Sequence, residues 1–410
     1  MERGDVTWIL VSAALVLFMV PGLALFYGGM SRSKNVLNML MMNMVCLGVV
    51  PIVWVVVGYT LAFGGDSSPG LIGNLDHLFF RGVDIGADGT GELLLFSFFA
   101  LTFAVITPAL ISGAVADRLR FGAWVALVVA WSVIVFAPTF HWIYGPNGWL
   151  AARGGLDFAG GTVVHVSAGA ASMAVILLLG KRRGWPGEPM PPHSLPLTML
   201  GAGILWFGWF GFNAGSAGAA EPQAIQAFVN TFIAAAAGMC TWLLAERARN
   251  GHATSLGAAS GVVAGLVAIT PGAGFLGTWS ALVVGALAGV VCFFAISVKY
   301  RLGYDDALDV VGVHFVGGLL GGVLIGVFAD PAVVSTAGVP EEFDAGLLAG
   351  GGAGLLVEQI IANVVVMVYS FVGTLAIAKV IDLVIGLRVD PDDEARGLDQ
   401  VMHAETGYNL

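Results

Sequence analysis

The sequence predicts an all-α integral membrane protein with eleven transmembrane helices, arranged as an inverted repeat of five plus five helices and one extra long helix. Three observations lead to this fold class. The 410 residues are 58% hydrophobic and 11% charged, whereas a soluble domain carries about 25% charged residues. The apolar residues form runs long enough to cross a bilayer, and basic residues gather in every second connection between these runs.

The apolar runs can be counted because a bilayer core requires about 20 residues per helix. The predicted spans are residues 7–29, 36–63, 92–115, 122–144, 158–179, 196–219, 223–245, 256–271, 276–298, 309–329 and 345–385. The eleventh is too long for a perpendicular crossing, so we expect it to tilt or to extend into the cytoplasm. The 59 glycines are typical of membrane helices that pack closely through small residues.

The basic residues predict the orientation in the membrane. With the N-terminus outside, 14 of the 17 Lys and Arg residues fall on the inner side, and only Arg3, Arg81 and Arg153 fall outside. The sequence therefore predicts an N-out, C-in topology, which requires an odd number of spans. We expect residues 1–385 to form the transmembrane domain and residues 386–410 a cytoplasmic C-terminal tail, with a sharp helix stop at Pro391.

Several classes of function find no support in the composition. Cys46, Cys240 and Cys292 lie in apolar segments without ligand spacing, so we interpret them as small buried hydrophobic residues. The net charge of -10 gives no indication of a nucleic-acid partner. The first apolar run has no small-residue cleavage site, so we expect it to be retained as the first helix.

Two stretches place ionisable residues inside the membrane. Asp157 stands eight residues before His165 at the start of the fifth predicted helix, and Asp309 precedes His314 at the start of the tenth. An ionisable residue in hydrocarbon costs about 2.5 kcal/mol or more, so each is a candidate for function. A single buried His is more often a core residue, but two in corresponding helices of the two halves favour a functional pair.

Three chemical interpretations of the histidine pair remain open. The imidazoles could line a narrow apolar pore and hydrogen-bond a small polar solute such as ammonia or water. They could ligate a metal or haem, although no third His, Cys or paired Glu stands at ligand spacing. They could couple protons to the transport of a larger substrate, which would require more polar pocket residues than these helices supply. The pore fits the sequence best, and we expect no cofactor.

Aromatic residues also stand at positions suited to a pore. Phe99 and Phe103 are four residues apart on one helical face, and Phe212 lies in the aromatic run before Ser216. Aromatic faces attract a cation by roughly 0.5–2 kcal/mol, and a hydroxyl can accept a hydrogen bond from an N–H donor. Core packing alone is the simpler explanation for any one of these rings.

These motifs resemble the ammonium transporter family (Amt/Mep/Rh), in its bacterial branch, over nearly the whole chain. The resemblance rests on residues 21–29, 33–37, 107–114, 157–165, 208–218 and 309–314, and on the tail residues 386–389 and 405–408. It implies an eleven-helix subunit of a homotrimer in the cell membrane, with one pore per subunit. It also implies ammonium or ammonia as substrate, with methylammonium as a further candidate, and no enzymatic activity.

The resemblance implies roles for individual residues. Phe103 and Ser216 match the outer recruitment site, with Phe99 beside them, and Phe103 and Phe212 match the phenylalanine gate. His165 and His314 match the twin histidines of the pore, and Asp157 matches an aspartate that supports binding or deprotonation. Where the family commonly has a Trp in the vestibule, this chain has Tyr144, with Trp142 as the other candidate.

The resemblance leaves a second class of function. A protein of this fold could be an ammonium sensor or receptor that signals through its cytoplasmic face. The short tail, residues 386–410, favours a plain transporter, whose inner face could bind a PII-like regulatory protein.

Overall fold

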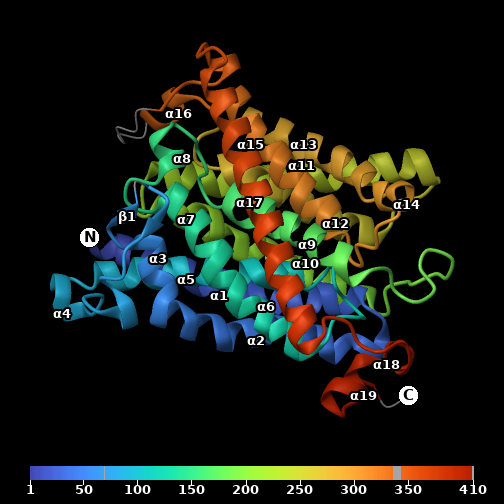
Figure 1. The fold of residues 1–410 in the computed structure, drawn as a ribbon. Helices are drawn as coiled ribbons and strands as arrows, with labels where there is room; N and C mark the ends of the chain where they lie inside the picture. The colour runs from blue at the N-terminus through green and yellow to red at the C-terminus, as the bar shows by residue number, and fades with distance from the viewer. Residues whose placement is uncertain (69, 336–342, 409–410) are drawn as a thin grey trace.

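The computed structural model describes residues 1–68, 70–335 and 343–408. Within these ranges eleven helical segments are long and apolar enough to cross a membrane, which confirms the predicted number. They form a single bundle in which the N-terminus and the C-terminal helices lie at opposite ends (Figure 1). We call these ends the N-terminal side and the tail side.

The first five spans contain several irregular turns. The helices are α1 (Arg3–Met30), η1 (Ser33–Asn35), α2 (Val36–Val53), η2 (Trp54–Gly58), α3 (Tyr59–Phe63), α5 (Glu92–Ile111), α6 (Phe121–Trp131), η4 (Ser132–Phe136), α7 (Ala137–Tyr144), α8 (Trp149–Ala152), η5 (Gly161–Val166) and α9 (Ser167–Leu179). Of these, η2, η4 and η5 are π-helical turns, which occur frequently at functional sites. The connection between α3 and α5, which lies on the N-terminal side, contains the hairpin β1 (Asp66–Ser68) and β2 (Ile72–Gly73), followed by η3 (Leu78–Phe80) and α4 (Ile85–Asp88).

The second five spans and the last helix complete the bundle. The helices are α10 (Leu195–Ala214), η6 (Gly215–Ala217), α11 (Pro222–Asn250), α12 (Ser255–Ile269), η7 (Thr270–Gly272), α13 (Thr278–Ala295), α14 (Val298–Leu302), η8 (Val311–Phe315), α15 (Val316–Phe328), α16 (Pro331–Ser335), η9 (Leu347–Ala349) and α17 (Gly354–Ile385). The predicted eleventh run began at residue 345, but α17 begins at Gly354 because residues 347–349 form the separate short helix η9. Beyond α17, the tail forms α18 (Pro391–Arg396) and α19 (Leu398–His403).

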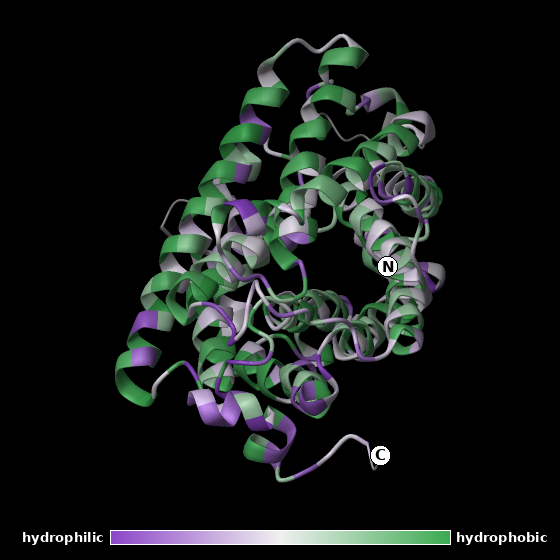
Figure 2. Cartoon of the chain, turned by 90° about the vertical axis from the view of Figure 1, so that its right-hand side faces the viewer, coloured by the Kyte–Doolittle hydropathy of each residue, from purple (hydrophilic) through white to green (hydrophobic). Residues whose placement is uncertain are grey.

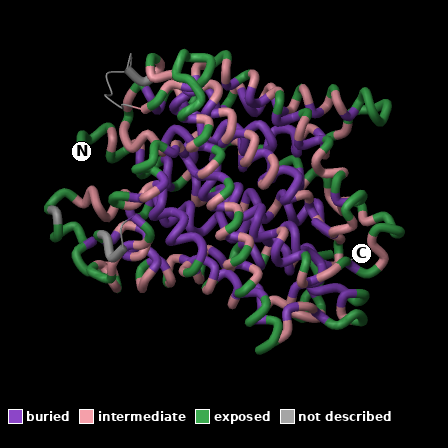
Figure 3. Tube along the Cα trace, turned by 45° about the horizontal axis from the view of Figure 1, so that its top comes forward, coloured by how far each residue is buried: buried purple, intermediate pink, exposed green. Residues whose placement is uncertain are grey.

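Glycines allow the helices to approach closely. A Cβ atom at Gly29 of α1 would lie 2.5 Å from the backbone nitrogen of Thr198 in α10, and one at Gly201 of α10 would overlap the backbone of Phe26. Close backbone contact takes the place of the hydrophobic drive that lipid does not supply. The buried residues accordingly fill the middle of the bundle (Figure 3).

Many large hydrophobic side chains of the helices are exposed, and hydrophilic residues concentrate in connections and in the tail (Figure 2). This distribution is what a bundle surrounded by lipid requires. Two of the three cysteines are buried as predicted, but the prediction was wrong for Cys240, which is exposed on α11. A small apolar residue is equally suited to the core and to a lipid-facing surface, so composition could not separate the two.

Candidate functional site

A cavity of about 230 Å³ lies at the N-terminal side, where several helix ends converge. Its lining residues are Phe63, Phe96, Phe99, Ala100, Phe103, Phe140, Tyr144, Phe158, Ala159, Gly215, Ser216 and Gly218. The predicted residues Phe99, Phe103, Tyr144 and Ser216 are therefore brought together here. Sequence reasoning missed Phe63, Phe96, Phe140 and Phe158, because their place in the cavity depends on how three separate helices and the connection before η5 meet.

The cavity is lined mainly by aromatic rings, and Ser216 and Tyr144 each carry a hydroxyl group. The ring of Phe99 lies 5.1 Å from that of Phe103, and the ring of Tyr144 lies 4.7 Å from that of Phe140. The Ser216 hydroxyl donates to the carbonyl oxygen of Phe212 at 2.9 Å. Because this contact uses its only hydrogen, the lone pairs of the hydroxyl are left to accept a hydrogen bond from a solute.

Trp142 lies outside this cavity. Its indole nitrogen donates to the carbonyl oxygen of Leu71 at 2.8 Å, and its ring packs against Trp149 and Tyr369. The indole therefore holds the connection on the N-terminal side against α17. Of the two aromatic candidates from the sequence, Tyr144 is the one that lines the cavity.

Below the cavity, two phenylalanine rings lie between it and a second cavity. The rings of Phe103 and Phe212 have centroids 4.3 Å apart and planes tilted by 40°. Phe103 lines the cavity above, whereas Phe212 lines a second, narrow cavity of about 10 Å³ below. A space of this size holds about one water-sized molecule.

The two histidines line the narrow cavity and contact each other. Nδ1 of His165 lies 3.2 Å from Nδ1 of His314, and the rings are stacked with centroids 5.3 Å apart. Nε2 of His314 lies 3.4 Å from the hydroxyl oxygen of Tyr27, which in turn lies 3.2 Å from the carbonyl oxygen of Leu110. A neutral imidazole carries one N–H, so these contacts constrain which nitrogen holds it.

The hydrogen-bond chain assigns the tautomers. The carbonyl oxygen of Leu110 can only accept, so it takes the hydroxyl hydrogen of Tyr27. The Tyr27 oxygen then accepts from Nε2–H of His314, whose Nδ1 accepts from Nδ1–H of His165. This leaves Nε2 of His165 with a free lone pair, and that buried atom has no hydrogen-bond partner among the described residues.

Two aromatic rings also pack against the imidazole of His165. Its ring is stacked on Trp209 at 5.4 Å and on Phe212 at 6.1 Å. The space between the histidines is too small for a porphyrin, because their Nδ1 atoms already lie at hydrogen-bond distance. No group of three or more His, Cys, Asp or Glu residues able to hold a metal ion was found in the described part of the chain.

Asp157 positions His165 through the backbone. Its carboxylate accepts four backbone N–H groups, from Gly160, Gly161, Thr162 and Val163, at 2.7–3.1 Å. These are N–H groups that the start of a helix leaves unpaired. The positive φ of 102° at Gly160 turns the chain so that all four point at the carboxylate. The π-helical turn η5, which contains His165, begins directly after this turn.

The second half repeats this arrangement with a different aspartate. Asp306, eight residues before His314, accepts the backbone N–H groups of Val310 and Val311 at 3.1 and 2.7 Å, and the π-helical turn η8 follows. Asp309 stands five residues before His314, as Gly160 stands five residues before His165. Like Gly160, Asp309 has a positive φ, of 64°. The sequence-based choice of Asp309 as the counterpart of Asp157 was therefore wrong. A matching spacing of eight residues was the available signal.

We call the segment from Asp157 to His165 the first motif and the segment from Asp306 to His314 the second motif. Helix α17 holds the start of the first motif. The buried amide of Gln359 accepts from the backbone N–H of Leu156 at 2.7 Å and donates to the Leu156 and Gly322 carbonyl oxygens at 2.8 and 3.1 Å. Asn363, one turn further, accepts from the hydroxyl of Thr162 at 3.2 Å. Gln359 thus connects the residue before Asp157 to α15, the helix that follows His314.

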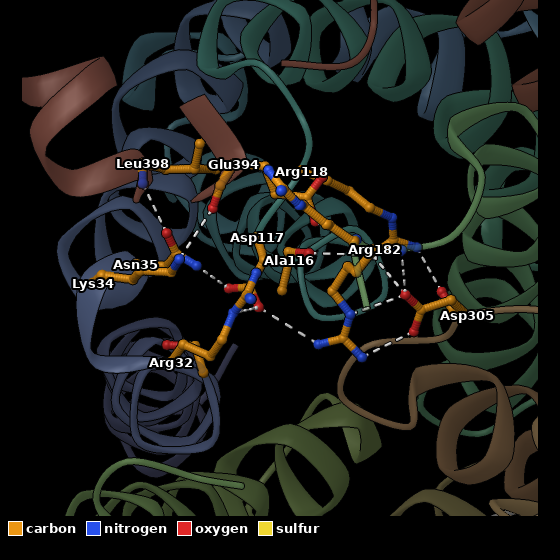
Figure 4. Close-up of polar contacts among 12 residues, drawn as sticks. Arg32, Lys34, Asn35, Ala116, Asp117, Arg118, Arg182, Asp305, Glu394 and Leu398 are labelled. Atoms are coloured by element: carbon orange, nitrogen blue, oxygen red, sulfur yellow. Dashed lines mark hydrogen bonds and ion pairs between the residues drawn. The ribbon is translucent and has the colours of Figure 1, made fainter. Parts of the chain in front are cut away.

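On the tail side, Asp305, which directly precedes the second motif, belongs to a buried ionic network (Figure 4). Arg182 donates to both carboxylate oxygens of Asp305, at 2.9 and 2.8 Å, and lies 3.5 Å from Asp117. Arg118 lies 3.9 Å from the same Asp305 carboxylate. Burial opposes its charge, but hydrogen bonds from Arg182 and the charge of Arg118 hold the pKa of Asp305 below its usual range.

The tail is attached to this network. Asn35 donates to Asp117 at 2.5 Å and accepts from the backbone N–H of Leu398 at 2.7 Å. The Glu394 carboxylate accepts from Arg388 and from the backbone N–H of Arg183, both at 2.7 Å. The tail is therefore packed against the tail side of the bundle, through groups adjacent to the second motif.

The chain is similar to known proteins over its full length. Residues 7–408 match the profile described as Ammonium Transporter Family. An ammonium transporter of Mycobacterium tuberculosis is 49% identical, covering 100% of this chain and 91% of that protein. The ammonium transporter Amt1 of Archaeoglobus fulgidus is 43% identical, with 100% of both chains covered.

Solved structures of related proteins have a similar fold. Mep2 of Saccharomyces cerevisiae has a TM-score of 0.89 and 35% identity, covering 96% of this chain and 89% of that one. A structure described as a sensor Amt protein has a TM-score of 0.88 and 29% identity, covering 98% of both chains.

Proposed function

The chain belongs to the ammonium transporter family and is a multi-pass protein of the cell membrane, and from this we propose how it moves its substrate. The family is one of transporters, which points to a protein that is not an enzyme. We propose that NH4+ is recruited in the aromatic cavity, transfers a proton to a water molecule that enters the cavity from the N-terminal side, and passes as NH3 between the phenylalanine rings to the histidines. The N-terminal side is then the outer side of the membrane.

Recruitment uses the chemistry of the cavity. The faces of Phe99, Phe103 and Tyr144 attract a cation, and the lone pairs of Ser216 accept an N–H. Among the described residues no carboxylate lines this cavity, so the ammonium ion is held weakly enough to leave. Tyr144 attracts a cation less strongly than a Trp would.

The single observation that carries the proposal is the free lone pair on Nε2 of His165. It faces an otherwise apolar space for about one small molecule, and an N–H of ammonia is a suitable donor to it. A bare cation in this space would lose its hydration without an opposite charge to replace it. Because K+ has no proton to release, it is excluded by the same cost.

Asp157 acts indirectly in this proposal. Its carboxylate is occupied by four backbone N–H groups, so it holds the turn that orients His165. Its negative charge beside the cavity residues Phe158 and Ala159 also favours a cation directly above the gate. Whether the released proton crosses along the histidine pair determines whether transport moves charge.

The test is the current across proteoliposomes after an ammonium pulse, with K+ pulses as control, for wild type, His165→Ala, His314→Ala and the double variant. We expect ammonium-specific transport whose rate or selectivity changes in each variant, with the oligomer intact by size exclusion. If current is absent, alkalinisation of the vesicle interior reports electroneutral NH3 movement. Unchanged transport in both single variants would contradict the role of the histidines.

A sensor or receptor is the second candidate, because a structure described as a sensor Amt protein shares this fold closely. A purified protein that binds ammonium but gives neither current nor alkalinisation would favour it. We also propose, from the family, a homotrimer that binds a PII-like partner at the tail side and accepts methylammonium. A pull-down from cells under changing nitrogen supply tests the partner.

A further inference from the structure

The hydroxyl of Tyr144 is a buried polar group to which the pathway described above gives no role. The ring of Tyr144 lines the aromatic cavity and packs against Phe140 at the end of α7. The hydroxyl oxygen at the far end of this ring is enclosed and makes no hydrogen bond with a described residue. A buried hydroxyl without a partner costs free energy, so its position requires an explanation.

The surroundings of this hydroxyl are electrostatic. It lies beside the carboxylate of Asp157 and the backbone N–H of Gly160, and α7 packs against the π-helical turn η5 that follows them. A carboxylate has about four lone-pair sites, and four backbone N–H groups already occupy those of Asp157. The hydroxyl of Tyr144 therefore lies in the field of a negative charge with which it forms no full hydrogen bond.

We propose that Asp157 polarises the hydroxyl of Tyr144, and that Tyr144 thereby sets the affinity of the cavity for monovalent cations. The carboxylate turns the hydroxyl hydrogen toward itself, and the interaction is strong because the surroundings have a low dielectric constant. The oxygen then releases electron density into the ring. The ring face that lines the cavity becomes more negative, and its attraction for a cation increases. This inference rests on the proposed function, in which the cavity recruits NH4+.

The enclosed position of the oxygen favours this role over a direct contact with ammonium. A cation in the cavity meets the ring of Tyr144, whereas the hydroxyl points to Asp157. Ser216 is the residue whose hydroxyl can accept an N–H there. A phenylalanine at position 144 would offer a ring without an O–H to polarise, and a tryptophan would offer a stronger face without any hydroxyl.

The experiment measures equilibrium binding of NH4+ and Rb+ to the purified full-length protein in detergent. Binding is read from the rise in melting temperature with cation concentration, with N-methyl-D-glucamine chloride keeping the ionic strength constant. Rb+ is the matched ion, because it has the same charge and a similar size but no N–H. For Tyr144→Phe we expect the dissociation constants of both ions to rise by about fivefold, the difference between a weak and a strong cation–π contact. Tyr144→Trp should bind both ions more tightly than Tyr144→Phe does.

Asp157→Asn tests the source of the effect. Without the charge beside the hydroxyl, adding Tyr144→Phe should change binding by less than about twofold. Tyr369→Phe is the matched control, since its hydroxyl donates to the carbonyl oxygen of Ile134 at 2.7 Å and it does not line the cavity. Tyr144→Phe removes a hydroxyl without a partner, so we expect it to fold without loss of stability. Should Asp157→Asn not fold, the comparison of the two ions on Tyr144→Phe still decides.

Three results would overturn the inference. One is unchanged binding of both ions by Tyr144→Phe, and another is an equal loss on adding Tyr144→Phe to Asp157→Asn. The third is a loss for NH4+ alone, which would identify the hydroxyl as a direct acceptor of an N–H. These results leave the proposed function intact, because that function is tested by transport in the histidine variants. A wild type that binds neither ion would contradict recruitment in this cavity, and with it the proposed function.

Discussion

The two histidines are placed by the same local structure in two different surroundings. In each half an aspartate stands eight residues before the histidine, a residue with positive φ stands five before it, and a π-helical turn follows. The first motif, Asp157 to His165, is held by neutral groups: four backbone N–H groups on the carboxylate and the amide of Gln359 on Leu156. The second, Asp306 to His314, is held mainly by charges.

The charges of the second motif come from the tail side. Lys299 donates to the Asp309 carboxylate at 2.7 Å and to the Asp306 backbone oxygen at 2.8 Å, and Asp305 joins the arginine network. Position 160 of the first motif is a glycine, which offers no side chain to pair. The comparison teaches that one helix start can be stabilised by neutral amides, and another by buried ion pairs at the tail side. We expect the second to respond to pH through Asp305 and to changes in the tail.

The largest effect is expected from Asp157→Ala. Four backbone N–H groups lose their acceptor, which we expect to lower the free energy of unfolding by about 2 to 4 kcal/mol and to abolish transport. Thermal unfolding and ammonium uptake measure the two effects separately. Asp157→Asn, which keeps one acceptor oxygen, should recover part of the stability. Wild-type transport in a folded Asp157→Ala protein would remove this residue from the mechanism.

The amide of Gln359 is the next test of the first motif. Gln359→Leu leaves the backbone N–H and carbonyl of Leu156 without partners, each costing about 1 to 3 kcal/mol when buried. Because the turn before His165 is then free to shift, we expect the ratio of ammonium to K+ transport to fall. Gln359→Glu keeps an acceptor for the Leu156 N–H and is the conservative control. A loss of stability with unchanged selectivity would make Gln359 a structural residue only.

A pH titration distinguishes the two motifs. The Asp305 carboxyl has a folded pKa below its usual value, so its contribution to stability is complete above the unfolded pKa of about 3.9. It is lost as the pH falls through the lower folded pKa. We expect the melting temperature of wild type to fall in this acid range, and Asp305→Asn to start lower at pH 7 and fall less. Parallel curves would show that this ion pair does not stabilise the second motif.

The smallest effect is expected from Arg153→Gln. Its guanidinium donates to both oxygens of Glu358 at 3.0 Å, but the pair is exposed, with side-chain accessibilities of 45% and 25%. An exposed ion pair contributes about 1 kcal/mol or less. We expect little change in melting temperature or uptake, even though this pair lies close in sequence to Asp157 and Gln359. A large loss would mean that charge also stabilises the first motif.

Much of this arrangement could be predicted from the sequence. Eleven spans follow from the lengths of the apolar runs, and the intramembrane histidines follow from the cost of polar groups in hydrocarbon. The cavity residues Phe99, Phe103 and Ser216 were predicted as well, partly through the resemblance to the family. By contrast, the choice between Tyr144 and Trp142 required the packing of the connection on the N-terminal side.

The sequence by itself determined the class of protein, the number of spans and the spacing of acid and imidazole, because hydrophobicity and helical period are local properties. Only the tertiary structure decided that Asp306, rather than Asp309, repeats the role of Asp157, since that depends on which carboxylate faces the free N–H groups of a helix start. The tertiary structure also decided the hydrogen bonds between Gln359 and Leu156 and the free lone pair on Nε2 of His165. Each depends on a partner about 150 to 200 residues away in the chain. Such contacts leave no periodic signal in one sequence.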